Sequence, residues 1–215
     1  MLTVIGSCLL IFGVACLGYV GYQLFGTNAA SQQSYRSERQ QLKQKWQDAE
    51  PESAGSQHGK KARRKAHAVP GDAIGLLSIP AIGLREIPIL QGTDTDVLAR
   101  GVGHYTKTAE AGQVGNFALA GHRITHGEPF AKLLQLTKGD DVVVETRSYI
   151  YTYEMDTSPR KLTVADTESW VLDPVPGKKN ATPTEKLLTL TTCQDLFHSP
   201  DRSVGFGHLA DTQKK

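Results

Sequence analysis

Short apolar stretches recur from residue 69 to about residue 211, and their pattern predicts a mainly β domain. Most are rich in β-branched or aromatic residues and are bounded by Gly, Pro, Asp or Asn, which commonly end strands. We expect eight strands, over residues 74–79, 84–89, 116–120, 142–146, 149–155, 161–165, 187–191 and 203–209. Helical patterns are few and short, the best covering residues 94–100 and 129–136. This spacing indicates a closed eight-stranded β-barrel with short helices rather than a parallel α/β sheet.

The amino-terminal segment, residues 2–25, is an unbroken apolar run and predicts a single transmembrane helix. Its 24 residues carry no charge, and as a helix they would reach about 36 Å, enough to cross a hydrocarbon core of about 30 Å. A cleaved signal peptide has a charged start and small residues at its exit, whereas this run ends in Tyr-Gln-Leu-Phe. Lipid modification at Cys16 is disfavoured because Gly13 replaces a larger aliphatic residue and the apolar run continues.

Residues 26–68 are polar and basic, and they predict a flexible stalk between the membrane helix and the β domain at residues 69–211. From residue 31 to residue 68 there are nine Lys or Arg and four Asp or Glu. Gln, Ser, Ala and Gly fill much of the remainder, a composition that buries too little surface to fold alone. The basic run at residues 60–65 has no interleaved aromatic residues for base stacking, so we expect no nucleic-acid partner.

Cys193 is the only cysteine of the predicted β domain, since Cys8 and Cys16 lie in the apolar run, and a disulfide within the domain is therefore excluded. The residues Thr-Leu-Thr-Thr precede it as an apolar strand. A lone cysteine after a core strand is more often inert than catalytic. Its surroundings favour chemistry, because Arg202 follows nine residues later and a hairpin would return it to the cysteine's end of the sheet.

His122 is the preferred proton acceptor for a Cys193 nucleophile. It follows Ala118-Leu119-Ala120-Gly121 at the exit of another apolar strand, and a cysteine nucleophile needs its base close in space rather than in sequence. The domain's other histidines are expected to be loop residues. A zinc site is disfavoured because the histidine spacings match no established zinc pattern.

These motifs resemble the sortase family of cysteine transpeptidases. The resemblance rests on Thr-Leu-Thr-Thr-Cys at residues 189–193, on the His122 loop and on Arg202. The sequences Gly-Val-Gly-His-Tyr at 101–105, Gly-Asn-Phe-Ala-Leu-Ala-Gly-His-Arg at 115–123 and Thr-His-Gly-Glu-Pro-Phe at 125–130 resemble class E sortases of high-GC Gram-positive bacteria. Gln194-Asp195 departs from the His-Pro common in class E after the cysteine, and residues 203–206 are less apolar than usual.

The resemblance implies a mechanism and two substrates. Cys193 would attack the Thr–Gly bond of a carboxy-terminal sorting signal, Leu-Ala-x-Thr-Gly in preference to Leu-Pro-x-Thr-Gly, on a secreted protein. His122 would act as general acid and base, and Arg202 would bind the oxyanion. The acceptor would be the amine of a lipid-linked peptidoglycan precursor. No cofactor, calcium site or other metal site is expected. The residues implied to contact the signal are Tyr105, Ala120, Val171, Leu172, Thr189, Thr191 and Thr192.

Three other functions stay open from the sequence. A pilus-type sortase usually has a lid segment and a carboxy-terminal span, neither of which is evident. A cell-wall cysteine hydrolase would use Cys193 and His122 but gives Arg202 no necessary role. The third is a catalytically inactive domain that binds wall polymer, and it would require the matches at Cys193, His122 and Arg202 to be coincidental.

The expected location is the cell membrane, with a single span and the catalytic domain outside the cytoplasm. The flanking charges argue the other way, because no Lys or Arg precedes the apolar run while four follow it between residues 36 and 45. An upstream start codon that adds basic residues would remove this conflict.

Overall fold

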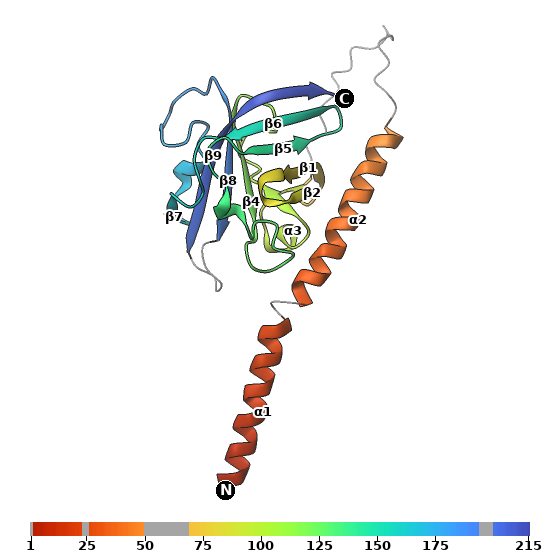
Figure 1. The fold of residues 1–215 in the computed structure, drawn as a ribbon, viewed down its shortest axis with the longest axis vertical. Helices are drawn as coiled ribbons and strands as arrows, with labels where there is room; N and C mark the ends of the chain where they lie inside the picture. Colours follow the sequence, from red (N-terminus) through yellow and green to blue (C-terminus); the bar gives the residue numbers. More distant parts are fainter. Residues whose placement is uncertain (1, 23–25, 50–68, 194–199) are drawn as a thin grey trace.

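The computed structural model describes residues 2–22, 26–49, 69–193 and 200–215. They form two consecutive helices and a β-barrel (Figure 1). Helix α1 (Leu2–Gly21) extends away from the barrel, whereas helix α2 (Thr27–Asp48) runs along its side. The barrel lies between α2 and the long loop that connects strands β7 (Thr163–Ala165) and β8 (Lys186–Cys193) (Figure 1).

Helix α1 has the length and composition of a membrane span. The stretch Val4–Gly21 has a mean hydropathy of 2.2, and none of it is buried inside the protein. A helix that is apolar on all sides and uncovered by protein matches a lipid environment better than water. This agrees with the predicted anchor over residues 2–25, of which residues 23–25 lie outside the described part of the chain.

Helix α2 lies where the sequence predicts a flexible stalk. It contains no Gly or Pro within Thr27–Asp48 and consists largely of residues with high helix propensity. Ser31, Tyr35 and Leu42 are buried along one face, and the helix contacts strands β1 and β2. A polar composition with few apolar residues favours a stalk in the sequence, because it does not reveal that these few residues pack against the barrel. Residues 50–68 lie outside the described residues, so that part of the stalk stays a prediction.

Nine strands are present in the described part of the chain, and eight of them close a barrel. The order around the barrel is β6-β5-β1-β2-β3-β4-β8-β9, and pairing of β9 with β6 closes it, while β7 pairs with β9. The predicted closed eight-stranded barrel is therefore confirmed. The strands are β1 (Ala73–Ile79), β2 (Leu84–Gln91), β3 (Val102–His104), β4 (Gly115–Gly121), β5 (Asp141–Glu145), β6 (Tyr149–Met155), β7 (Thr163–Ala165), β8 (Lys186–Cys193) and β9 (Asp201–Lys214).

Strand β9 closes the barrel because it is long enough to pair on both sides. Its first half pairs with β8 between Arg202 and His208, and its second half pairs with β6 up to Lys214. Closure removes the free sheet edge that would otherwise be exposed. The interior is filled by large side chains such as Phe117, Leu133 and Tyr153. Burying each apolar side chain of this size contributes about 1.5–3 kcal/mol.

One of the eight strands that form the barrel is not among the eight predicted from the sequence. The predicted strand at residues 161–165 is β7, which lies outside the ring. The ring instead contains β3, which the sequence did not predict. With only three residues, including Gly103 and His104, β3 is too short to show an alternating pattern.

The predicted helices are shorter than expected. Of residues 94–100, only α3 (Thr95–Leu98) is helical, and within residues 129–136 only a 3₁₀ turn, η3 (Leu133–Gln135), forms. Further 3₁₀ turns are η2 (Pro80–Ile82) and η4 (Ser169–Leu172), the latter within the long loop between β7 and β8. Segments this short are stabilised by packing rather than by helix propensity.

His104 makes the stability of the barrel depend on pH. Its side chain is buried between Gln91, Ala109 and the ring of Phe117. Burial lowers the pKa of His104 from its ordinary value of 6.5. The unfolded chain therefore binds a proton here before the folded chain does, so the free energy of unfolding should fall as the pH drops below about 6.5.

We expect His104→Gln to remove part of this pH dependence. Urea unfolding of the full chain in detergent micelles, followed by tryptophan fluorescence at pH 7.5 and 5.5, measures it. Equal pH dependence in the variant and in the unmodified chain would show that His104 is not responsible.

Candidate active site

The ends of three neighbouring strands bring His122, Cys193 and Arg202 to one end of the barrel. Strands β4 and β8 are parallel, and Gly121 lies opposite Thr192. His122, which follows β4, therefore leaves the sheet beside the end of β8. Strands β8 and β9 are antiparallel, and Cys193 lies directly opposite Arg202. The predicted hairpin return of the arginine is thus observed in the backbone register.

Parallel pairing explains why both functional positions follow apolar strands. Every residue of β4 is buried, and β8 is buried from residue 188 to residue 192. Strands in the interior of a sheet read as continuous apolar runs, and their carboxyl ends meet at one edge. The structure describes the backbone of Cys193, whereas its side chain and residues 194–199 lie outside the described part of the chain.

A cavity of about 140 Å³ opens at this end of the barrel. Two of its lining residues are in contact, since the Tyr105 hydroxyl lies 3.3 Å from Thr191 Oγ1. The cavity places His122 and Arg202 around one small space. Its lining residues are Thr93, Leu98, Tyr105, Ala120, Gly121, His122, Thr191, Thr192 and Arg202.

The structure brings some of the predicted signal-binding residues together and separates others. Tyr105, Ala120, Thr191 and Thr192 line the cavity with His122. Thr189 does not, because its hydroxyl is buried and donates to Asn116 Oδ1 at 2.7 Å.

Val171 and Leu172, the two predicted signal-binding residues on turn η4, lie in different surroundings. Thr189 Oγ1 lies 3.2 Å from the carbonyl oxygen of Val171, which is itself buried. Thr189 and Val171 therefore fix this turn to the barrel. Leu172 instead lines a neighbouring hollow of about 520 Å³, to which Tyr105 also contributes.

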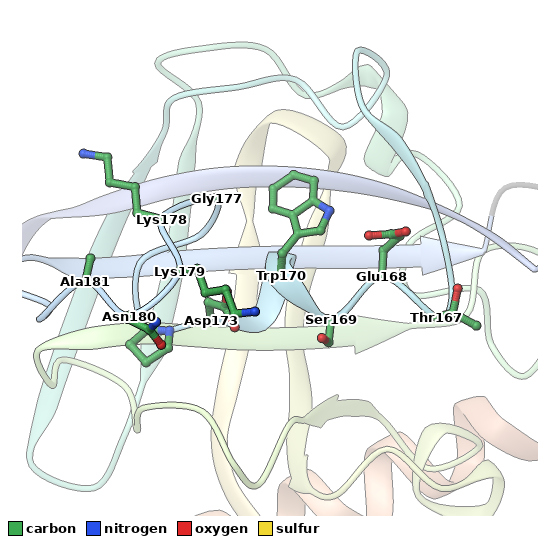
Figure 2. A pocket seen from close by; sticks show the side chains of 11 residues that line it. Thr167, Glu168, Ser169, Trp170, Asp173, Gly177, Lys178, Lys179, Asn180 and Ala181 are labelled. Carbon is green, nitrogen blue, oxygen red and sulfur yellow. The ribbon is translucent and has the colours of Figure 1, made fainter.

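Three hollows that share lining residues follow one another from His122 to the loop between β7 and β8. The 520 Å³ hollow shares Thr93 and Tyr105 with the small cavity and shares Ser169 and Asp173 with a third hollow of about 770 Å³. Figure 2 shows this third hollow, with Trp170 and the lysines of the loop around it. The hollows therefore lie next to one another on one side of the barrel.

Asp166 lies beside Arg202 and was not predicted from the sequence. Its Oδ2 lies 3.7 Å from Arg202 Nη2, and Arg202 Nη1 donates to the carbonyl oxygen of Asp201 at 3.1 Å. Strand β7 places Asp166 here, because Val164 pairs with Arg202. The two contacts orient the guanidinium group at the cavity, and both partners are partly exposed.

Gly121 lets the strand that carries His122 pack closely against Phe130. A Cβ atom at Gly121 would lie 2.7 Å from the Phe130 ring. The Phe130 backbone N–H donates to the carbonyl oxygen of His122 at 2.9 Å, and the Phe130 side chain is fully buried. The loop between β4 and η3 is therefore anchored at both ends around His122.

His126 stacks on His122 with ring centroids 4.7 Å apart and an interplanar angle of 27°. The prediction of loop histidines holds for His126, whereas His104 lies in β3 and His208 lies in β9. Burial lowers the pKa of His126 from its ordinary value of 6.5, so its ring is neutral at pH 7. A neutral ring can pack on His122 without repelling a protonated His122. The spacing of four residues between these histidines was the signal that could have revealed the stack.

Comparisons with known proteins identify close relatives. A family model described as Sortase domain matches residues 77–210. Sortase SrtE1 of Streptomyces coelicolor is 34% identical to this chain over an alignment that covers 98% of this chain and 58% of the relative. The chain therefore spans less than two thirds of that relative's length. Sortase D of Bacillus subtilis is 29% identical, with 91% and 92% coverage respectively.

Solved structures give the same result. The structure of sortase E from Streptomyces avermitilis is 40% identical in sequence and superposes with a TM-score of 0.61. The match covers 68% of this chain and 93% of that chain. The likeness therefore extends to three-dimensional arrangement as well as to sequence.

Proposed function

Because the chain belongs to the sortase family and is most like class E, we propose that it is a membrane-anchored cysteine transpeptidase. It cleaves the Thr–Gly bond of a carboxy-terminal sorting signal and transfers the new carboxyl end to an amine. The observation that carries the proposal is the strand register, which sets Cys193 opposite Arg202 and places His122 after the residue opposite Thr192.

The first half-reaction is acylation. The Cys193 thiolate attacks the threonine carbonyl carbon and forms a tetrahedral intermediate, whose oxygen carries the negative charge. The guanidinium of Arg202 donates hydrogen bonds to this oxygen, a role suited to a planar, always charged group. The intermediate collapses as the C–N bond breaks, and His122 gives its proton to the departing glycine amine. A thioester on Cys193 remains.

The second half-reaction is transfer. An acceptor amine attacks the thioester carbonyl, and His122 takes a proton from the attacking nitrogen. The C–S bond breaks and releases Cys193 as the thiolate, so the enzyme returns to its starting protonation state. Attack by water in place of the amine would make the chain a hydrolase instead.

The cavity and the hollow beside it are the proposed binding groove for the signal. The cavity of about 140 Å³ has the size for a small side chain next to the scissile bond. Tyr105 stands where the cavity meets the larger hollow, whose lining includes Leu172. The preference for Leu-Ala-x-Thr-Gly over Leu-Pro-x-Thr-Gly is proposed from the likeness to class E.

Helix α1 supports a location at the membrane. The catalytic domain is proposed to lie outside the cytoplasm because the likeness to sortases implies secreted protein substrates. In Figure 1 strand β9 begins at the end of the barrel nearer to α1, so the candidate site faces the side on which the anchor lies. A secreted protein still held in the membrane and a lipid-linked peptidoglycan precursor would both reach the site there.

Peptide cleavage by the full chain in detergent micelles tests the proposal. Fluorogenic Leu-Ala-x-Thr-Gly and Leu-Pro-x-Thr-Gly peptides are supplied with and without triglycine, and products are identified by mass spectrometry. We expect cleavage between Thr and Gly, a Thr–triglycine product and about tenfold higher kcat/KM for the alanine-containing peptide, equivalent to about 1.4 kcal/mol.

Other outcomes distinguish the alternatives. Cleavage that yields only the free threonine acid, even at high triglycine, would favour the hydrolase. Failure to form an acyl-enzyme with either peptide would contradict the proposed thiolate mechanism and favour a binding domain.

A further inference from the structure

Helix α2 holds the loop beside His122 from outside the barrel. The Tyr35 hydroxyl donates to the carbonyl oxygen of His126 at 2.6 Å. The Asn28 side chain accepts a hydrogen bond from the Gly127 N–H at 2.8 Å and donates another to Glu128. Three adjacent loop residues are therefore bound to a helix about 90 to 100 residues away in the sequence.

These three loop residues share an unusual backbone conformation. His126, Gly127 and Glu128 have φ angles of 54°, 78° and 49° respectively. Residues with a side chain rarely adopt this left-handed backbone conformation. Where they do, contacts with the surrounding structure hold the backbone in place. The hydrogen bonds from α2 are made at these positions, so the helix helps to hold the loop backbone in this conformation.

The ring of Tyr35 fits directly against Gly127. A Cβ atom on Gly127 would lie 2.8 Å from atoms of that ring. Tyr35 is only 3% exposed, and burial raises the pKa of its hydroxyl above the ordinary value. The hydroxyl therefore stays protonated and remains a hydrogen-bond donor to the loop.

The loop transmits this contact to the active site through His126. Its backbone is bound by Tyr35, and its ring stacks on His122 at 4.7 Å. We infer that Tyr35 is a positioning residue for the reaction, because it fixes the loop conformation that sets the place of the His122 ring. This inference rests on the proposed function, in which His122 transfers protons.

A misplaced proton donor slows the chemical step more than it weakens binding. A displacement of about 1 Å can cost roughly a hundredfold in rate. We therefore expect Tyr35→Ala to lower kcat by about tenfold to a hundredfold, with KM for the peptide changed less than about twofold. Tyr35→Phe keeps the ring against Gly127 and loses only the hydrogen bond, so its kcat should lie between those of Tyr35→Ala and the unmodified chain.

Leu42→Ala is the matched control on the same helix. Leu42 is 4% exposed and packs against the barrel, but it has no hydrogen bond to the loop among the described residues. This variant should lower the melting temperature by an amount comparable to that of Tyr35→Ala while keeping kcat within about twofold. If kcat instead follows the melting temperature across all three variants, Tyr35 acts through helix docking alone and the inference is overturned.

A double variant tests the contact between Tyr35 and Gly127 directly. In the unmodified chain, Gly127→Ala has two costs: its Cβ atom clashes with the Tyr35 ring, and its φ angle is unfavourable for alanine. In the Tyr35→Ala background only the φ angle remains, so the loss of kcat caused by Gly127→Ala should be smaller. Equal losses in both backgrounds would contradict the contact.

Histidine ring signals separate this inference from the proposed function. The full chain, labelled with ¹³C-histidine in detergent micelles, is compared by NMR with Tyr35→Ala and Leu42→Ala. We expect the His122 and His126 ring signals to shift in Tyr35→Ala and to stay in place in Leu42→Ala. Unchanged signals in Tyr35→Ala overturn the inference, whether or not the chain cleaves peptides. Absence of cleavage by the unmodified chain overturns the proposed function and leaves the ring signals to decide the role of Tyr35.

Discussion

Replacing Cys193 with alanine should abolish both Thr–Gly cleavage and amine transfer. The sulfur is the proposed nucleophile, and no other described cysteine lies in the β domain, since Cys8 and Cys16 are on α1. Without an acyl-enzyme neither half-reaction proceeds, so we expect kcat to fall by roughly 10⁴-fold or more. Mass spectrometry of the chain with peptide should show a thioester adduct in the unmodified chain and none in Cys193→Ala.

The double variant Cys8→Ala/Cys16→Ala is the matched control. Both cysteines are exposed on α1, so their removal should leave kcat/KM within about twofold. Activity that survives in Cys193→Ala would exclude Cys193 as the nucleophile. Activity that disappears in the double control would show that the cysteines of α1 are also required.

His122→Ala should produce the second largest loss. General acid and base catalysis typically contributes 10²–10⁴-fold, so we expect kcat to fall by about this factor while KM changes little. The barrel should remain folded, because His122 follows β4 and is not part of its buried interior. Steady-state kinetics of the full chain with the preferred peptide, together with the melting temperature, measures this effect.

His208→Ala is the control for His122→Ala. His208 lies on β9, contacts Asp156 at 2.9 Å and does not line the cavity. Its replacement should leave kcat unchanged within about twofold. A loss smaller than about tenfold in His122→Ala would argue for a different proton carrier, and His126 would then be the residue to replace.

The location of the candidate site was predictable because strand exits leave a local signal. Apolar runs that end at His122 and at Cys193 specify two central strands, and the carboxyl ends of parallel strands meet at one edge. Arg202 was predictable because a hairpin brings the start of one strand to the end of the preceding strand. The contact of Asp166 with Arg202 was not predictable, because an acidic residue at the start of a loop has the same sequence pattern whether or not it contacts an arginine.

The barrel was predictable as a class, whereas its strand order was not. Alternation and turn residues identify strands such as β5 and β6 one at a time. They do not say which strand pairs with which, and three-residue strands such as β3 leave too little pattern to detect. The pairing of β6 with β9 depends on the length of β9. The last residues of β9 are exposed and polar, so their sequence resembles an irregular carboxy-terminal tail rather than a strand.

The sequence by itself determined the apolar anchor, the β-barrel class and the residues offered for chemistry, because these depend on local composition and periodicity. Only the tertiary structure decided that α2 packs on the barrel and binds the loop beside His122. The buried residues Tyr35 and Leu42 are few in a polar helix, and such a helix is stable through its partner rather than through its own composition. The loop is more than 90 residues away in the sequence, and strands β1 and β2 also belong to a separate part of the chain, so no local pattern could indicate either partner.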